Sequence, residues 1–293
     1  MIELHRPAGS LASGPDAVVV TPEAAGWTLS ALRVLVLRPG ERRVLELEGF
    51  EAAVLPLAGS AEVEVGSRSF ALVGREDVFS RVSDFVYLPA GSEAVVSTEA
   101  GGEFALPAAR AERRLEAAHV PAHAVRVEVR GGGPATRQIN NFMSADAFEA
   151  DRLIAVEVLT PDGNWSSFPP HKHDEHSERE VPLEEIYYFR IRGEGGFGLH
   201  RTYTTDGEID ATVTVGDGDV FLVPRGFHGP CVAPPGYPMY YLNVMAGPER
   251  AWRVCTDPAH EWLWSLFERM GPDPRCPLST ADGPVADPHP AGR

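Results

Sequence analysis

Short apolar runs with strand-like alternation dominate the chain, and stripes with helical spacing are rare. Between residues 32 and 104, runs rich in valine and leucine, such as LRVLVL, AEVEVG and FVYLP, follow one another at intervals close to ten residues. Glycine, proline and charged residues separate them. This spacing predicts antiparallel strands in a sandwich or barrel. The same pattern resumes in residues 125–247, so we predict an all-β fold.

Four segments depart from this pattern. Residues 107–124, which contain AARAERRLEAAH, are rich in alanine, arginine and glutamate and predict a short helix or linker. The run GGGPATRQINNF predicts a glycine-rich loop with a polar end, and it lacks the lysine of a phosphate-binding loop. HEWLWSLFERM predicts an amphipathic helix in which Trp262 and Trp264 pack against the protein. Residues 271–293 are rich in proline and glycine, and we expect them to be extended or disordered.

A weak internal repeat divides the chain. Glu51 and Glu185 each precede an apolar run, and the step from the glutamate to the next glycine is the same in both. Farther along, PAGSE (89–93) aligns with PRGFH (224–228), with glutamate in place of the final histidine. An offset of about 134 residues predicts two copies of one barrel, of which the first binds no metal. We therefore predict an N-terminal barrel over residues 1–122, a C-terminal barrel with the metal site over 123–270, and a tail over 271–293.

Composition narrows the classes of partner and the location. The 293 residues include 42 acidic and 26 basic side chains, a net charge of −16, which argues against binding to nucleic acid or to an anionic membrane. No apolar run has the length of a membrane span, and the N-terminus lacks the pattern of a signal peptide. Three cysteines without metal-type spacing favour a reducing compartment. We expect a cytoplasmic protein.

The candidate chemistry lies in the second half. His171 and His173 are separated by one residue, so on a strand their side chains leave the same face. Glu185 opens the next apolar run, and His228 follows in VPRGFHG. Three imidazoles and a carboxylate can bind one divalent metal, with zinc, manganese, iron and nickel all suitable. Glu178 has a shorter spacing from His173, but the repeat favours Glu185 as the ligand, with Glu184 on the opposite face.

Longer runs carry a resemblance to a known family. GDVFLVPRGFH resembles the second motif of the cupin barrels, with one residue fewer before the histidine, and an insertion, HSEREVPLE, stretches the first motif. ADRLIAVEVLTPDGNWSSFPPHKHDE, LEEIYYFRI and YYLNVMAGP resemble the bacterial 5-deoxy-glucuronate isomerases of myo-inositol catabolism. These enzymes are related to the 5-keto-4-deoxyuronate isomerases. The resemblance extends over most of the chain, as far as about Trp262.

The resemblance implies a fold, a reaction and a metal. It implies a bicupin of two antiparallel β-barrels of jelly-roll type, with short helices and a C-terminal extension, and a homo-oligomer. The reaction is an aldose–ketose isomerisation of the sugar acid 5-deoxy-D-glucuronate to 5-dehydro-2-deoxy-D-gluconate, by proton transfer or by a hydride shift. One divalent metal per chain, zinc first, would act as a Lewis acid. The family's ligands carry over onto His171, His173, Glu185 and His228.

The remaining candidates lie around that site. For proton transfer we consider acidic and imidazole side chains of the insertion, namely Glu178, His176 and Glu175. For the substrate carboxylate we consider arginines, whose forked guanidinium binds a carboxylate through two hydrogen bonds, namely Arg179, Arg201 and Arg225. Alternation along the strands predicts that three further side chains border the site, namely Tyr187, Tyr241 and Asn243.

Three other functions are alternatives to isomerisation. A cupin dioxygenase would bind iron and consume oxygen. A non-catalytic cupin would bind a sugar without turnover, and a structural bicupin would lose no activity when His171 is replaced.

Overall fold

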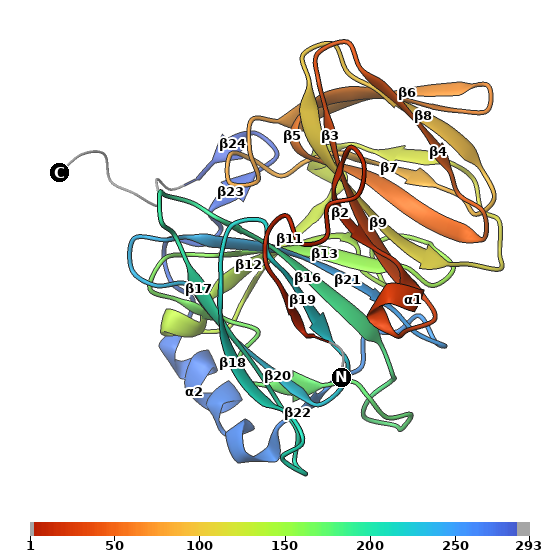
Figure 1. Cartoon of the computed structure of the whole chain (residues 1–293). Coiled ribbons are helices and arrows are strands. Elements are labelled where there is room, and N and C mark those ends of the chain that lie inside the picture. Colours follow the sequence, from red (N-terminus) through yellow and green to blue (C-terminus); the bar gives the residue numbers. More distant parts are fainter. Residues whose placement is uncertain (1–2, 286–293) are drawn as a thin grey trace.

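The computed structural model describes residues 3–285 and is built from β-sheets in two halves (Figure 1). The first half, coloured red to yellow, forms a nine-stranded antiparallel sheet that folds over its own core. Its strands are β2 (Asp16–Val20), β3 (Ser30–Leu37), β4 (Arg42–Glu46), β5 (Phe50–Val65), β6 (Arg68–Arg75), β7 (Phe85–Leu88), β8 (Glu93–Ser97), β9 (Gly102–Arg110) and β10 (Ala118–Val120).

The second half, largely green and blue, has two sheets with a core between them. The seven-stranded sheet contains β1 (His5–Arg6), β11 (Arg126–Arg130), β12 (Arg137–Met143), β13 (Ile154–Thr160), β16 (Glu184–Ile191), β19 (Val220–Val223) and β21 (Met239–Ala246). The six-stranded sheet contains β14 (Trp165–Ser166), β15 (His171–Lys172), β17 (Gly198–Tyr203), β18 (Asp210–Val215), β20 (Phe227–Val232) and β22 (Cys255–Thr256).

Helices are few and short. They are α1 (Pro22–Ala25), α2 (Leu263–Met270) and the 3₁₀ turns η1 (Ala122–Ala124), η2 (Gly133–Ala135) and η3 (Pro258–His260). A small hairpin of β23 (Ser279–Thr280) and β24 (Gly283–Pro284) completes the described residues. Within residues 3–285, no helix is long and apolar enough to cross a membrane. The all-β prediction is confirmed. The domain limits stay a prediction, and β1, from the start of the chain, pairs with β19 of the second half.

Tertiary pairing overrides local composition between residues 102 and 118. Of the short helix or linker predicted over 107–124, the helix is wrong at its start, because β9 continues to Arg110, where Ala109 lies opposite Ser30 of β3 and Glu51 of β5. Helical structure within this range is limited to the 3₁₀ turn η1. The linker that follows is irregular. The predicted loop GGGPATRQINNF is also wrong at its polar end, since Arg137–Met143 is the wholly buried strand β12.

The C-terminal segment packs differently from the prediction. On α2, Trp262 at its N-cap is 62% exposed and Trp264 is 38% exposed, whereas Leu263 and Phe267 are buried and attach the helix. The described part of the tail, residues 271–285, packs against the protein. Leu278 joins the core, and its backbone N–H donates to the Gln138 side chain. Residues 286–293 of the predicted extended or disordered tail lie outside the described part of the chain.

The two halves share a core because the strands alternate between two faces. On β16, Ile186 and Tyr188 pack against the first half, whereas Tyr187 and Phe189 face the interior of the second. Leu55 of β5 belongs to the same shared core. One face of the seven-stranded sheet is thus used for joining the halves, and the other face is free to carry a site.

Two glutamates join the halves reciprocally. The Glu51 carboxylate accepts hydrogen bonds from the backbone N–H groups of residues 151–153, at 2.6–2.8 Å. The Glu184 carboxylate accepts hydrogen bonds from the backbone N–H groups of residues 28–30, at 2.7–2.9 Å. Glu51 lies opposite Ala109 and Glu184 lies opposite Ala246 in matching strand pairs. By contacts, the counterpart of Glu51 is therefore Glu184, one residue before the Glu185 that the repeat suggested.

A buried ion pair adds a third link between the halves. The guanidinium of Arg75 pairs with the Glu157 carboxylate, and both side chains are almost wholly buried. Tyr240 and Asn140 also donate hydrogen bonds to Glu157. Because removing one partner of such a pair leaves a buried charge uncompensated, this contact fixes how the sheets meet.

We predict that Glu51→Ala destabilises the whole protein, because the backbone N–H groups of residues 151–153 and the Tyr87 hydroxyl lose a charged acceptor. The expected loss is about 3 kcal/mol, which lowers the melting temperature by about 5–10 °C. Glu184→Ala should have a smaller effect, because Glu184 is half-exposed. The control, exposed Glu99→Ala, should change stability by less than about 0.5 kcal/mol. A wild-type melting temperature for Glu51→Ala would contradict the role of this contact.

Candidate metal centre and cavity

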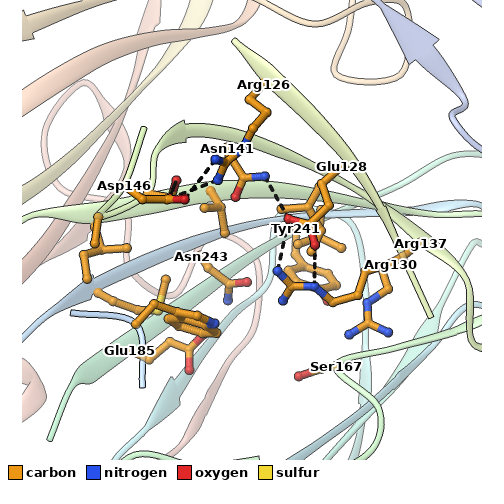
Figure 2. Close-up of a pocket in the computed structure, with 18 of the residues that line it drawn as sticks. Arg126, Glu128, Arg130, Arg137, Asn141, Asp146, Ser167, Glu185, Tyr241 and Asn243 are labelled. Carbon is orange, nitrogen blue, oxygen red and sulfur yellow. Dashed lines mark hydrogen bonds and ion pairs between the residues drawn. The ribbon is translucent and has the colours of Figure 1, made fainter. Parts of the chain in front are cut away.

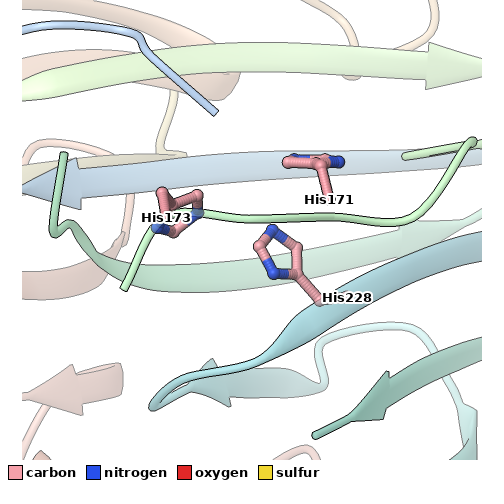
Figure 3. Close-up of side chains that lie close together, drawn as sticks. All are labelled: His171, His173 and His228. Atoms are coloured by element: carbon pink, nitrogen blue, oxygen red, sulfur yellow. The ribbon is translucent and has the colours of Figure 1, made fainter. Parts of the chain in front are cut away.

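Three histidines meet on the inner face of the second half. His171 of β15 lies directly opposite His228 of β20, and His173 follows just beyond β15. Each offers a ring nitrogen, and these atoms lie within 4.8 Å of one another. Figure 3 shows the three rings turned toward a common point. The spacing of one residue between His171 and His173 thus places both rings on one side of the chain, as predicted.

Glu185 completes the cluster from the neighbouring strand β16. Its Oε2 atom lies 2.8 Å from Nε2 of His173 and 3.0 Å from Nε2 of His228. Despite its burial, the nearby His228 and His173 hold the pKa of Glu185 well below its usual range. Desolvation, followed by the other two imidazoles, lowers the pKa of His171. An ionised carboxylate beside three imidazoles is a donor set that fits a divalent transition metal.

Backbone carbonyls orient two of the imidazoles. Nδ1 of His173 lies 3.0 Å from the Leu183 carbonyl oxygen, and Nδ1 of His228 lies 3.3 Å from that of Gly226. In each ring this leaves Nε2 facing the cluster, which is the usual arrangement around a bound metal. Gly226 has φ 88°, and a Cβ there would lie 2.6 Å from the Tyr203 carbonyl oxygen. The glycine of PRGFH is therefore required for the turn that places His228.

A cavity of 390 Å³ opens beside the cluster (Figure 2). His171 and Glu185 form part of its wall, and the predicted bordering residues Tyr187, Tyr241 and Asn243 also line it. Nδ2 of Asn243 is buried without a hydrogen-bond partner among the described residues. The volume of the cavity is in the range of small-molecule sites, about 300–1,000 Å³.

The structure separates the predicted arginines from this cavity. Arg179 is exposed, and Arg201 and Arg225 form surface ion pairs with Asp210 and Asp206, with 42% and 41% of their side chains exposed. None of the three lines the cavity. The arginines that do line it were missed, namely Arg126, Arg130 and Arg137. Alternation in VRVEVR could have placed the first two on one face, but Arg137 was assigned to a loop.

The first part of the insertion, residues 176–179, lies at the surface. His176 and Glu178 are exposed and absent from the cavity wall, so the structure brings Glu185 to the histidines and leaves Glu178 apart. Lys172, the only lysine in the sequence, binds Asp174 and buried Glu180, both at 2.6 Å. Glu175 lies 3.1 Å from the same amine. Lys172 therefore holds the base of the insertion.

Comparison with known proteins gives the family. A model of the KduI/IolB family matches residues 4–263. The chain belongs to the KduI/IolB family. The 5-deoxy-glucuronate isomerase of Geobacillus thermodenitrificans is 43% identical to this family member over 251 residues, which cover 85% of this chain and 91% of that protein. The protein of the same name from Bacillus subtilis is 38% identical over 247 residues, which cover 83% and 91%.

Solved structures extend the comparison to the fold. An IolB-like protein from Salmonella typhimurium matches with a TM-score of 0.85 and 35% identity, over 89% of this chain and 99% of that chain. Oxalate decarboxylase from Bacillus subtilis matches with a TM-score of 0.63 and 15% identity, over 87% and 80%. The second likeness concerns the fold alone. The predicted bicupin fold and family are confirmed, and this KduI/IolB family member is an isomerase.

We predict that His228→Ala weakens binding of a divalent metal by at least about 100-fold. Loss of a residue that only hydrogen-bonds to a metal ligand already lowers metal affinity about 10–100-fold, and loss of the ligand itself should cost more. The measurement is metal content after dialysis, followed by zinc titration. His176→Ala, in the exposed insertion, is the matched control and should bind as much metal as the wild type. Full metal content in His228→Ala would remove His228 from the set of ligands.

Proposed function

We propose that this protein is a metal-dependent aldose–ketose isomerase that converts 5-deoxy-D-glucuronate to 5-dehydro-2-deoxy-D-gluconate in myo-inositol catabolism. The observation that carries the proposal is the convergence of three imidazoles and Glu185 beside a cavity whose wall includes His171 and Glu185. It occurs in a chain whose relatives, at 37–43% identity, are named 5-deoxy-glucuronate isomerases. A sugar acid is the class of substrate that this name implies.

The proposed ligands are His171, His173, Glu185 and His228, with zinc as the first choice of metal and manganese, iron or nickel as alternatives. The fit rests on the donor set, on the burial of His173, Glu185 and His228, and on the carbonyl groups that orient the two buried histidines. When bound, the metal would supply a Lewis acid that polarises the substrate carbonyl.

The side chains of the chain itself would orient the sugar and exclude water. Tyr187 and Asn243 lie opposite each other on β16 and β21, and both border the cavity beside Glu185. Asn243 has a free amide donor for a substrate oxygen. A buried donor that only the ligand can satisfy favours the ligand that carries the matching oxygen.

Proton transfer by His176 or Glu178 stays a prediction, since both side chains are exposed in the insertion and would need that segment to turn inward. Substitution to glutamine tests each one. A fall in kcat at unchanged metal content would support the role. A wild-type kcat would assign the transfer to groups on the cavity wall. The predicted homo-oligomer, cytoplasmic location and lack of nucleic-acid or membrane binding are likewise proposals, the last supported by the net charge of −16.

We predict that the purified protein converts 5-deoxy-D-glucuronate to the ketose, as followed by proton NMR. Removing the metal with a chelator should abolish turnover, because the carbonyl is then no longer polarised, and adding back a divalent metal should restore it. Oxygen uptake in the same assay should be zero. Ketose formation that is unaffected by metal removal, or oxygen uptake in place of isomerisation, would contradict the proposal.

We predict further that turnover in D₂O places one deuterium on the product carbon that receives the hydrogen. A base in the cavity exchanges its proton with solvent, whereas a hydride moves directly between the two carbons. Mass spectrometry of the product distinguishes the two routes. A product without deuterium would exclude transfer through a base that exchanges its proton with solvent.

A further inference from the structure

One buried cation in the cavity forms no ion pair with the described residues. Arg137, at the start of β12, is 6% exposed, and its Nη1 donates to the carbonyl oxygens of Ala135 and Phe168 at 3.2 and 3.1 Å. Within residues 3–285, no carboxylate lies within 4.0 Å of its guanidinium nitrogens, and Nε and Nη2 make no hydrogen bond. Desolvation lowers the pKa of Arg137 to about 10, which still leaves it charged at neutral pH.

The other deeply buried arginine gives the contrast. Arg75 is equally removed from water, but Glu157 neutralises it. A buried charge without a partner costs several kcal/mol, so in a chain with an excess of acidic residues its persistence calls for a compensating group. At Arg137 the hydrogen-bond partners in the described chain are the neutral oxygens of two carbonyls, and Glu128, which acts from farther away, is already paired with Arg130. An anion that enters the cavity would supply such a partner.

The remaining arginines of the cavity wall are already neutralised. Arg130 binds both oxygens of Glu128, at 2.8 and 3.1 Å, and Arg126 pairs with Asp146 at 2.9 Å. Figure 2 shows these two pairs joined by dashed lines, while Arg137 lies apart from them near Ser167. Arg137 is therefore the cavity-lining cation, within the described chain, whose guanidinium is available to a ligand.

The position of Arg137 relative to the histidine cluster defines the shape of the ligand. In Figure 2, Glu185 stands on one side of the cavity and Arg137 on the other, with Tyr241 and Asn243 behind the space between them. A short molecule with oxygen atoms at both ends would satisfy both. Hydroxyl groups along its middle would meet the free amide of Asn243.

We propose that Arg137 is the receptor for the carboxylate of the substrate and selects sugar acids over neutral sugars, with the carbonyl end at the His171–Glu185 side of the cavity. The inference rests on the proposed function for the orientation of the substrate. A forked guanidinium binds a carboxylate through two parallel hydrogen bonds, and lysine cannot reproduce that geometry.

The test compares 5-deoxy-D-glucuronate with its methyl ester, which keeps the carbon chain and removes the charge. In the metal-loaded wild type, we expect kcat/KM for the acid to exceed that for the ester by about 100-fold. Arg137→Gln should abolish this preference, chiefly by raising KM for the acid, while the ester is turned over at nearly the wild-type rate. Arg137→Lys should retain part of the preference. Equal kcat/KM values for acid and ester in the wild type would overturn the proposal.

Two controls separate recognition from folding. Metal content of Arg137→Gln should equal that of the wild type, and its melting temperature without ligand should be no lower, because the substitution removes a buried charge that has no partner. If this variant does not fold, the comparison of acid and ester in the wild type and in Arg137→Lys still decides the question. Arg225→Gln tests the competing assignment from the sequence. If Arg225→Gln loses the preference for the acid while Arg137→Gln keeps it, the proposal is also overturned.

A binding measurement separates this inference from the proposed reaction. Calorimetric titration with D-glucuronate and with its methyl ester measures binding without turnover. If 5-deoxy-D-glucuronate is not isomerised but the acid binds more tightly than the ester and Arg137→Gln removes the difference, the receptor stands and the reaction is wrong. If turnover is normal and Arg137→Gln leaves the affinity for the acid unchanged, the reaction stands and the receptor is wrong.

Discussion

Alternation along β16 is the constraint on which the rest of the structure depends. Glu184 and Glu185 are adjacent, so their side chains leave opposite faces of the seven-stranded sheet. Glu184 binds three backbone N–H groups of the first half, and Glu185 meets the histidines of the second. A shift of one residue in this strand would exchange these roles and break both contacts. The joint between the halves and the candidate metal centre are therefore set by one register.

This arrangement gives the first half a function although it contributes none of the four proposed ligands. Glu51 repeats the contact of Glu184 in the opposite direction, and Arg75 reaches into the second half to pair with Glu157. These contacts hold the seven-stranded sheet from the face away from the cavity. Side chains on the inner face can then be positioned accurately, as a metal site requires. The first half acts as a support for the floor of the site.

Charge is distributed unevenly between the surface and the cavity. The chain has a net charge of −16, yet its cavity contains the guanidinium of Arg137 without a carboxylate partner in the described residues. The neighbouring pair Arg130–Glu128 is closed on itself. An anionic substrate is repelled by the outer surface at long range, so recognition has to come from close contacts within the cavity. This favours selection by contact rather than rapid capture.

Local sequence determined the features that depend on spacing along one segment. The strand runs, His171 and His173 at a separation of one residue, and the turn before His228 all follow from strand period and turn chemistry. Tertiary structure decided what depends on contacts between distant segments. Pairing with β3 and β5 made a strand of 102–110 despite its alanine- and arginine-rich end, and burial in the sheet made β12 from an apparent loop. Arg137 lies in the cavity and Arg225 at the surface. Composition alone does not predict which arginine pairs with a carboxylate. That choice depends on which segments fold together.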